Sequence, residues 1–249
     1  MSDPVTRLRT YGRDLGSIPI SRLPTEFDKA CFICVNTYQS YRLNLGTGPL
    51  NDAVSLAKCV KNFGFHIYFL HNPHSRNFLK YLDHFFQFTT DHLVFFYVGH
   101  GTTVRDLDGD EDDGNDEAFV FDDGNIVDDE LIDHLINNKN PNNRITLITD
   151  ACHSGSIWDI QGGDVNGREL PDKIISISAA NDRQTAKQTV IERQDQGVFT
   201  YNLTKTIKSN PTITPKELKT AMTKSLRKYA QTFTVATTSN ELLDMPLFE

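Results

Sequence analysis

Six short apolar runs alternate along the chain with segments of helical periodicity, and this alternation constrains the fold more than any other feature. The apolar runs cover residues 29–35, 65–70, 92–98, 144–149, 173–178 and 232–237. Between them, apolar residues recur at helical spacing in 50–60, 75–88, 128–136, 198–207 and 215–229. Strands that alternate with helices form a mainly parallel sheet with helices on both faces. The sequence therefore predicts an α/β fold with a six-stranded, mainly parallel sheet.

The pattern also suggests how the chain is divided. Residues 1–28 show no clear periodicity, and we expect an irregular N-terminal arm there. Residues 29–249 are expected to form a single domain, with a large region at 29–160, a linker at 161–172 and a smaller region at 173–249. The polar stretches 158–172 and 182–196 are expected to be loops open to processing. Residues 118–121 and 124–127 are expected to form a small hairpin.

Three residues are candidate helix caps. Asn51 and Asp128 precede or open two of the apolar stripes, and Thr214 stands directly before Pro215. Asn, Asp and Thr side chains accept hydrogen bonds from the free N–H groups of a first helical turn, and proline is favoured at the first helical position. We therefore expect helices to begin at these three places.

Composition limits the classes of function. No apolar run reaches the roughly 18 residues of a membrane span, and the N-terminus lacks the apolar region of a secretory signal. We therefore expect no membrane contact, and a reducing compartment, the cytoplasm or the nucleus, for its four cysteines. The net charge is −8, and residues 106–130 alone hold thirteen Asp and Glu with no Lys or Arg. This concentration of acidic residues points to a local cation site or a solvated loop. The sequence contains no basic stripe with interleaved aromatic residues, so we expect no nucleic-acid partner.

Two of the apolar runs end in residues suited to nucleophilic catalysis. One runs into Gly99-His100-Gly101, and another runs into Asp150-Ala151-Cys152. The carboxyl ends of parallel strands share one edge of an open α/β sheet, and active sites lie at that edge. A cysteine and a histidine brought together there predict a thiol nucleophile and its base. Cys152 as a buried structural residue stays open as an alternative, and His153 is the poorer base because neighbours on an extended segment point to opposite sides.

At these residues the chain resembles the metacaspases, relatives of the caspases. The resembling pieces are YVGHGT at 97–102, RDLDGDEDDGNDE at 105–117, IVDDEL at 126–131, DACHSGS at 150–156, SAANDRQTA at 178–186 and QGVFTYNL at 196–203. These pieces follow one another in the same order as in metacaspases, and the resemblance covers roughly residues 29–238. The interval between the DACHSGS and SAANDRQTA segments is short, which is similar to type I members of the family. Cys152 lies 52 residues after His100, close to the roughly 50 of caspases. The resemblance implies a three-layer caspase-like fold, a dyad of Cys152 and His100, and an oxyanion hole from the backbone N–H groups of Gly101 and Cys152.

Two aspartates are candidates for the specificity pocket. Asp150 stands two residues before Cys152, and Asp52 lies near the start of the first helix after the first strand. Two carboxylates at one pocket select a cation, and an arginine satisfies them by bidentate pairing. Metacaspases have such a pocket and cleave after Arg or Lys. A helix cap is the alternative for Asp52. The chain departs from the family at Val98, where Ser is usual, and at Pro49, where Cys is usual.

The acidic segment first suggests an EF-hand, with Asp106, Asp108, Asp110 and Glu117 at suitable intervals. We exclude an EF-hand because Glu111 stands where glycine is required and no helix pair flanks the segment. The metacaspase resemblance implies instead a calcium site formed by Asp116, Asp128, Asp129 and Asp159. Carboxylate oxygens without His or Cys suit Ca²⁺. A solvated acidic loop remains the alternative.

The leading interpretation is a monomeric, calcium-dependent cysteine endopeptidase that takes polypeptide substrates with Arg or Lys at the cleavage site. A catalytically inactive scaffold on the same fold is a second hypothesis, supported by Val98 and Pro49. A thiol oxidoreductase that uses Cys31 and Cys34 is a third. It is disfavoured because this CxxC lies inside an expected strand, where core packing is the simpler explanation.

Overall fold

A seven-stranded sheet forms the centre of the computed structural model, which describes residues 2–105, 115–152, 155–161, 164–165, 167–179, 188–191 and 194–249. The strand order is β1-β3-β2-β4-β8-β11-β14. All neighbours pair in parallel except β11 and β14, which are antiparallel. The strands are β1 (Gly12–Asp14), β2 (Phe27–Val35), β3 (His66–His71), β4 (Thr89–Val98), β8 (Arg144–Asp150), β11 (Ile174–Ala179) and β14 (Phe233–Thr237). The predicted α/β class and the six predicted strands are confirmed.

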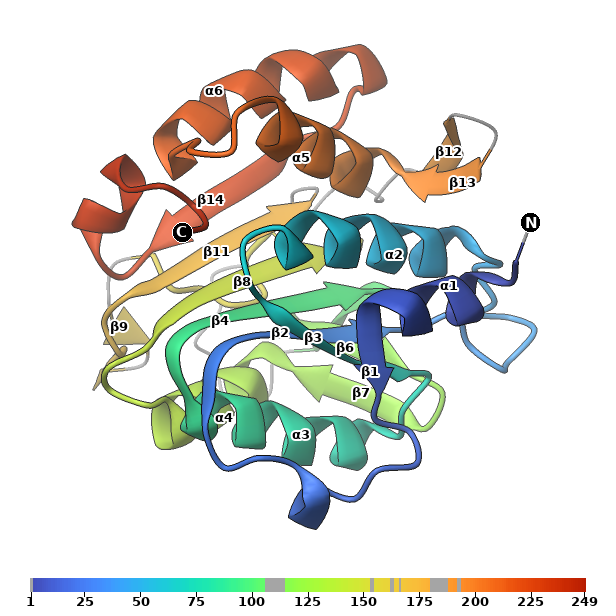
Figure 1. Ribbon diagram of the computed structural model, residues 1–249, viewed down its shortest axis with the longest axis horizontal. Coiled ribbons are helices and arrows are strands. Elements are labelled where there is room, and N and C mark those ends of the chain that lie inside the picture. Colours follow the sequence, from blue (N-terminus) through green and yellow to red (C-terminus); the bar gives the residue numbers. More distant parts are fainter. Residues whose placement is uncertain are drawn as a thin grey trace.

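Helices cover both faces of the sheet, so the molecule has three layers (Figure 1). On one face lie α1 (Pro4–Tyr11), α2 (Gly48–Lys61), α5 (Val198–Ser209) and α6 (Pro215–Leu226), and their apolar residues share one core cluster. On the other face lie α3 (Ser75–Phe88) and α4 (Asp128–Asn138), which form the second cluster. Short 3₁₀ turns lie at Ile20–Arg22, Arg227–Tyr229 and Asn240–Asp244. Within the described ranges, none of the helices has the length and apolar character needed to cross a bilayer.

The N-terminal arm is not irregular, and this prediction was wrong. Asp3 caps α1 by accepting a hydrogen bond from the Thr6 N–H, and Leu8 buries that helix against the core. Residues Gly12–Asp14 then pair with β3 as the seventh strand. A three-residue edge strand is too short to show a period of two, which is why the sequence pattern missed it.

Strand β2 shows why the CxxC pair cannot act as a dithiol. Cys31 and Cys34 are fully buried and belong to different core clusters, so their side chains lie on opposite faces of the sheet. Side chains alternate between the two faces along a strand, so residues that are three positions apart, such as Cys31 and Cys34, point to opposite faces. Burial also raises the pKa of both thiols. The oxidoreductase hypothesis has no geometric support.

Smaller sheets lie outside the central sheet. The predicted hairpin exists as β6 (Asn115–Phe121) and β7 (Gly124–Val127), extended by β5 (Gly101–Arg105) into a three-stranded sheet. Two further hairpins lie in stretches that we expected to be loops. These are β9 (Asp164–Val165) with β10 (Arg168–Glu169), and β12 (Gln188–Ile191) with β13 (Gln194–Gly197).

The helix caps follow the sequence only in part. Thr214 caps α6 through a capping box with Glu217, as expected. Asn51 is not a cap, because α2 begins at Gly48 and Asn51 lies buried inside the helix. Asp128 is the first residue of α4, and Val127 occupies the cap position. Proline at the start of α2 moved the helix boundary upstream of the residue chosen from its side chain.

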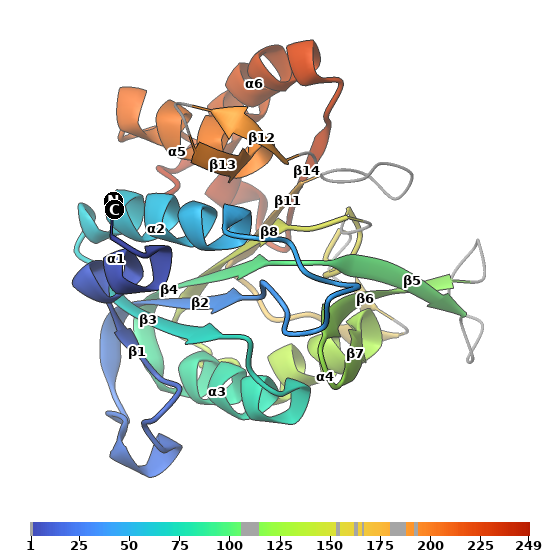
Figure 2. The same cartoon turned by 90° about the vertical axis from the view of Figure 1, so that its right-hand side faces the viewer.

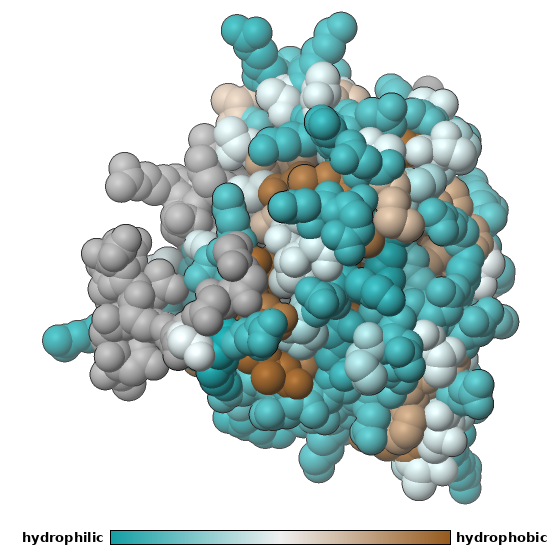
Figure 3. All heavy atoms as spheres, turned by 90° about the vertical axis from the view of Figure 1, so that its left-hand side faces the viewer, coloured by the Kyte–Doolittle hydropathy of each residue, from teal (hydrophilic) through white to brown (hydrophobic). Residues whose placement is uncertain are grey.

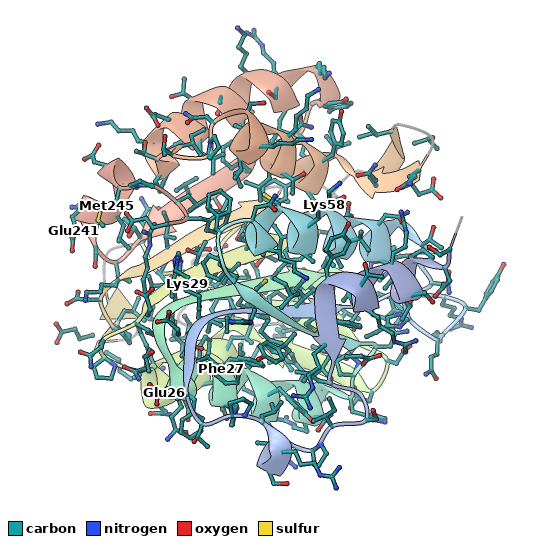
Figure 4. The ribbon with its side chains drawn as sticks, in the orientation of Figure 1. Glu26, Phe27, Lys29, Lys58, Glu241 and Met245 are labelled. Carbon is teal, nitrogen blue, oxygen red and sulfur yellow. The ribbon has the colours of Figure 1, made fainter. Side chains whose placement is uncertain are left out.

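The amino ends of the parallel strands form the edge of the sheet that carries no predicted site residue. This face is largely hydrophilic with small apolar areas between polar side chains (Figure 3). At the start of β2, Phe27 packs against Phe85 of α3, with ring centroids 5.1 Å apart. After an irregularity in the strand, Lys29 lies toward the opposite layer, 5.5 Å from the Phe65 ring (Figure 4).

Candidate active site

The carboxyl ends of β2, β4 and β8 bring the predicted catalytic residues to one edge, which faces the viewer in Figure 2. Val35, Val98 and Asp150 are in register on these three strands. The two loops that leave β4 and β8 touch directly. A Cβ atom at Gly101 would lie 2.0 Å from the carbonyl oxygen of Cys152, so only glycine permits this approach. His100 and Cys152 therefore follow neighbouring strands and lie on loops in backbone contact.

His100 is held at both its backbone and its ring. Its N–H donates to the Tyr38 hydroxyl, and its carbonyl accepts from the Tyr97 hydroxyl at 2.7 Å. The Tyr38 ring lies against the imidazole, with centroids 4.9 Å apart. His100 Nε2 lies 2.8 Å from the Leu43 carbonyl oxygen. A carbonyl only accepts, so we assign the proton to Nε2, and Nδ1 is then the ring atom that can accept a proton.

Cys152 follows β8 by two residues and is half-buried. The described residues that follow contact the acidic hairpin, which is formed by β6 and β7. There the Ser156 N–H and hydroxyl both donate to the Glu117 carboxylate on β6. His153 and Ser154 lie outside the described residues. The rival base and the turn that would follow the thiol therefore stay predictions.

Asp52 and Asp150 form a buried acidic pair beside the catalytic edge. Asp52 is 1% exposed and Asp150 is 6% exposed. Burial, and then the charge of Asp150, raise the pKa of Asp52 well above its usual range. Burial raises the pKa of Asp150 to about 6. Because Asp52 lies inside α2 and its carboxylate accepts from a distant residue, it is not a helix cap.

The start of α5 supplies the partners of this acidic pair. The Gly197 N–H donates to both oxygens of Asp52, at 2.8 and 3.0 Å. The Thr200 hydroxyl donates to Asp150 Oδ2 at 2.6 Å, and the Thr200 N–H is 3.3 Å from the same oxygen. A Cβ atom at Gly197 would lie 2.6 Å from Asp150 Oδ2 and 2.8 Å from Asp52 Oδ2. Gly197 therefore lies between the two carboxylates, close to both.

The two departures from the family pattern border the same place. Val98 is 2% exposed and is in register with Asp150 on the neighbouring strand. Pro49 is buried in the first turn of α2, three residues before Asp52 and so on the same side of the helix. Both positions carry apolar side chains, and both carboxylates of the acidic pair are in place.

Three of the four predicted calcium ligands lie on two neighbouring segments, β6 and α4. Asp116 on β6 and Asp129 on α4 are close enough to Asp128 for their charges to act on it. Together with burial, the largest cause, they raise the pKa of Asp128 to about 6. Asp128 Oδ2 accepts from the Glu117 N–H at 3.0 Å, and its Oδ1 accepts from the Asp129 N–H at 2.9 Å.

Asp159 lies on the segment that follows Cys152, where its N–H donates to the Ser156 carbonyl at 2.7 Å and its φ of 30° is unusual for a residue other than glycine. Ser156 in turn is bonded to Glu117, the neighbour of Asp116. Within the described ranges, no three His, Cys, Asp or Glu side chains converge on a common point as a metal cage would require. Residues 106–114 of the acidic segment lie outside the described residues.

Trp158, beside Asp159, is a packing residue. Its indole is 1% exposed and lies edge-on to Phe95 and Phe119, with centroids 6.0 and 6.2 Å apart. The structure therefore places Trp158 in the core and not on the wall of a substrate pocket.

Several residues of the site carried no recognisable signal. Leu43 contributes only its backbone carbonyl, and any residue type could do so. Tyr38 lies in an irregular loop with a φ of 65°. Gly197 and Thr200 lie within the QGVFTYNL segment that resembles metacaspases, yet the motif alone does not say that they bind the two aspartates.

Comparison with known proteins identifies the family. Residues 28–244 match the model of the caspase domain. Metacaspase-1A of Aspergillus terreus is 50% identical over 74 residues, which are 28% of this chain and 18% of that protein. Metacaspase-1 of Ajellomyces capsulatus is 49% identical over 74 residues, 28% of this chain and 21% of that protein. The resemblance to metacaspases is thus confirmed, and the matched segment spans about a fifth of the length of these curated relatives.

Solved structures confirm the fold. A protein of Geobacter sulfurreducens superposes with a TM-score of 0.67 at 20% identity, over 89% of this chain and 98% of that one. Caspase-1 of Spodoptera frugiperda superposes with a TM-score of 0.62 at 13% identity, over 87% and 89% of the two chains. The three-layer caspase-like architecture predicted from the sequence is therefore correct.

Proposed function

The chain belongs to the caspase-domain family of peptidases, and from that premise we propose that it is a calcium-dependent cysteine endopeptidase that cleaves after Arg or Lys. One observation carries the proposal. The loops that bear His100 and Cys152 are in direct contact through Gly101, and the buried acidic pair lies on the same edge of the sheet. A nucleophile, a base and a cation-selective pocket are the three parts that such an enzyme needs.

In the proposed mechanism, His100 Nδ1 takes the proton of the Cys152 thiol. The Leu43 carbonyl holds the ring by accepting from Nε2–H, which leaves Nδ1 as the basic atom. The thiolate attacks the carbonyl carbon of the scissile peptide, and the backbone N–H groups of Gly101 and Cys152 donate to the developing oxyanion. The imidazolium then gives its proton to the departing amine, and water hydrolyses the thioester through the same histidine.

The acidic pair supports a preference for a basic side chain at the cleaved position. In the free protein, burial favours the protonated form of both Asp52 and Asp150. A guanidinium or ammonium placed between them would favour ionisation of both and compensate for the desolvation of the two charges. An acidic substrate side chain would instead add a third negative group to a buried site.

The proposal also includes dependence on calcium. Asp116, Asp128 and Asp129 offer hard oxygen atoms that suit Ca²⁺, and the charges of Asp116 and Asp129 act on Asp128. Among the described residues these carboxylates do not converge on one point, so a bound cation would have to draw them together. Asp159 would join them from the segment after Cys152, to which Glu117 is already connected through Ser156. When bound, Ca²⁺ would supply positive charge that offsets the repulsion among these carboxylates. The bonds between Ser156 and Glu117 would then hold the acidic hairpin against the segment that follows Cys152.

Hydrolysis of fluorogenic peptides tests this function. Two peptides that differ only in Arg or Asp at the cleaved position are compared, each in millimolar Ca²⁺ and in excess chelator. We expect cleavage of the Arg peptide in calcium, with little cleavage in chelator or of the Asp peptide. Asp159→Ala should lose the calcium response and keep the wild-type unfolding temperature. Preference for Asp, or equal rates in chelator, would contradict the corresponding part of the proposal.

The inactive-scaffold hypothesis has no specific observation in its favour, since Val98 and Pro49 leave the contact between the catalytic loops and the acidic pair in place. We also propose that the enzyme acts as a monomer in the cytoplasm or nucleus. Sedimentation of the purified chain and fractionation of cells test these two points.

A further inference from the structure

Asn51 links three elements from a buried position. It is 5% exposed and precedes Asp52 on α2. Its Nδ2 donates to the Asp195 carbonyl on β13 at 2.8 Å, and its Oδ1 accepts from Arg7 Nη2 on α1. Asparagine is a weak helix former, and Asn51 is not a cap here, so local helix stability does not explain this side chain. Its contacts do.

The bond from Asn51 reaches the strand that borders the acidic pair. Asp195 is in β13, paired with Val190 of β12, and Gly197 at the end of the same strand donates to Asp52. Consecutive residues of α2, Asn51 and Asp52, therefore hold β13 at two points two residues apart. Figures 1 and 2 show the hairpin and α1 on opposite sides of the amino-terminal end of α2.

Arg7 determines which way the Asn51 amide points. A guanidinium only donates, so Arg7 requires the oxygen of the amide, and the NH₂ group must then face Asp195. Arg7 is itself half-buried, on a helix anchored by Leu8. Without Arg7, the amide could rotate and present its oxygen to the Asp195 carbonyl, where two acceptors would repel each other.

We propose that Asn51 and Arg7 are positioning residues for the specificity pocket, through which the N-terminal helix α1 sets the position of the β12–β13 hairpin beside Asp52 and Asp150. The inference rests on the proposed function of that acidic pair. It assigns to the N-terminal segment a part in substrate binding, while the thiol and imidazole stay independent of it. Loss of either residue should therefore raise KM for Arg peptides and leave the reactivity of Cys152 unchanged.

The test compares full-length Arg7→Ala, Arg7→Lys and Asn51→Ala with Arg9→Ala. Arg9 is the matched control, since it lies on the same helix and its guanidinium binds Asp14. Four quantities are measured: amide hydrogen exchange of residues 194–197, KM and kcat for an Arg peptide, and the rate at which iodoacetamide alkylates Cys152. Iodoacetamide is small and carries no basic side chain, so its rate does not depend on the acidic pair.

We expect Arg7→Ala and Asn51→Ala to speed exchange in the hairpin and to raise KM by roughly ten- to a hundredfold, the scale of a misplaced binding group. Alkylation should stay within about twofold of wild type. Arg7→Lys, which keeps a donor, should restore most of the affinity, and Arg9→Ala should match wild type.

Unchanged exchange and KM in Arg7→Ala would overturn the inference, even if Asn51→Ala fails to fold. So would a rise in KM shared by Arg9→Ala. If the wild-type chain cleaves no Arg or Lys peptide, the proposed function fails, and hydrogen exchange in the hairpin still decides whether Arg7 and Asn51 position it.

Discussion

Binding of a small cation to the acidic pair should be coupled to proton release. Burial raises the pKa of Asp150 from 3.8 to about 6, and burial and the charge of Asp150 raise the pKa of Asp52 well above its usual range. A folded-state pKa above the unfolded value means that the folded protein keeps protons that the unfolded chain has lost. The pair therefore destabilises the free fold as pH rises above about 4. The shift in the pKa of Asp150 alone lowers the free energy of unfolding at neutral pH by about 3 kcal/mol.

A bound cation reverses this preference, because it favours the ionised carboxylates. Benzamidine, which carries a planar cation like that of arginine, is a suitable probe. With a pKa of about 6, Asp150 is mostly ionised at pH 7.5 and only about one-tenth ionised at pH 5. Benzamidine affinity should therefore fall at least about tenfold between these two pH values. At pH 5, where Asp150 is mostly protonated, binding should release up to about one proton from Asp150.

Isothermal titration calorimetry measures both quantities, when the heats are compared in buffers of different ionisation enthalpy. The Cys152→Ala variant is used so that self-cleavage does not intrude, and Asp52→Asn serves as the control that should bind weakly and release little. Affinity that is independent of pH between 5 and 7.5, or proton uptake on binding, would refute the assignment of this pair as a cation pocket.

Three substitutions follow from the same geometry. Gly197→Ala would place a methyl group within 2.8 Å of both carboxylates, and should raise KM for Arg peptides with Cys152 alkylation unchanged in a paired assay. Gly101→Ala would collide with the Cys152 carbonyl, and should lower both kcat and the alkylation rate; wild-type alkylation would count against the loop contact. Thr200→Val removes the 2.6 Å bond to Asp150 and should cost about 1–3 kcal/mol of unfolding free energy at pH 8, with a smaller loss at pH 5 where Asp150 is protonated. A loss equal at both pH values would contradict that reasoning.

The fold was predictable because its strands and helices have clean periods. Six of the seven sheet strands were found from apolar runs, since strands buried on both faces are apolar throughout. The edge strand β1 was missed because its three residues are polar or glycine and it pairs with a distant strand, and the β12–β13 hairpin was missed because β13 is polar apart from its glycine. The edge of the sheet that carries His100 and Cys152 followed from topology alone, because parallel strands share their carboxyl ends.

The remaining parts of the site depend on tertiary contacts that no local pattern reports. The Leu43 carbonyl, the Gly197 N–H and the buried Asn51 amide act through backbone atoms or through partners far away in the chain. Asn51 shows the difference most clearly. Its side chain predicted a helix cap, and the proline in the preceding turn moved the helix start so that the same amide became a link between α1 and β13.

The most direct measurement of the central claim is covalent labelling of the chain with two peptidyl chloromethyl ketones that differ only in Arg or Asp at the reactive end. These reagents require a nucleophile, its base and the specificity pocket in one place. In Ca²⁺, the account predicts rapid modification by the Arg reagent alone, found by peptide mass mapping on Cys152, and slowed strongly by His100→Ala and by Asp52→Asn. Labelling at Cys59, equal rates with the two reagents, or full labelling of His100→Ala would contradict the account.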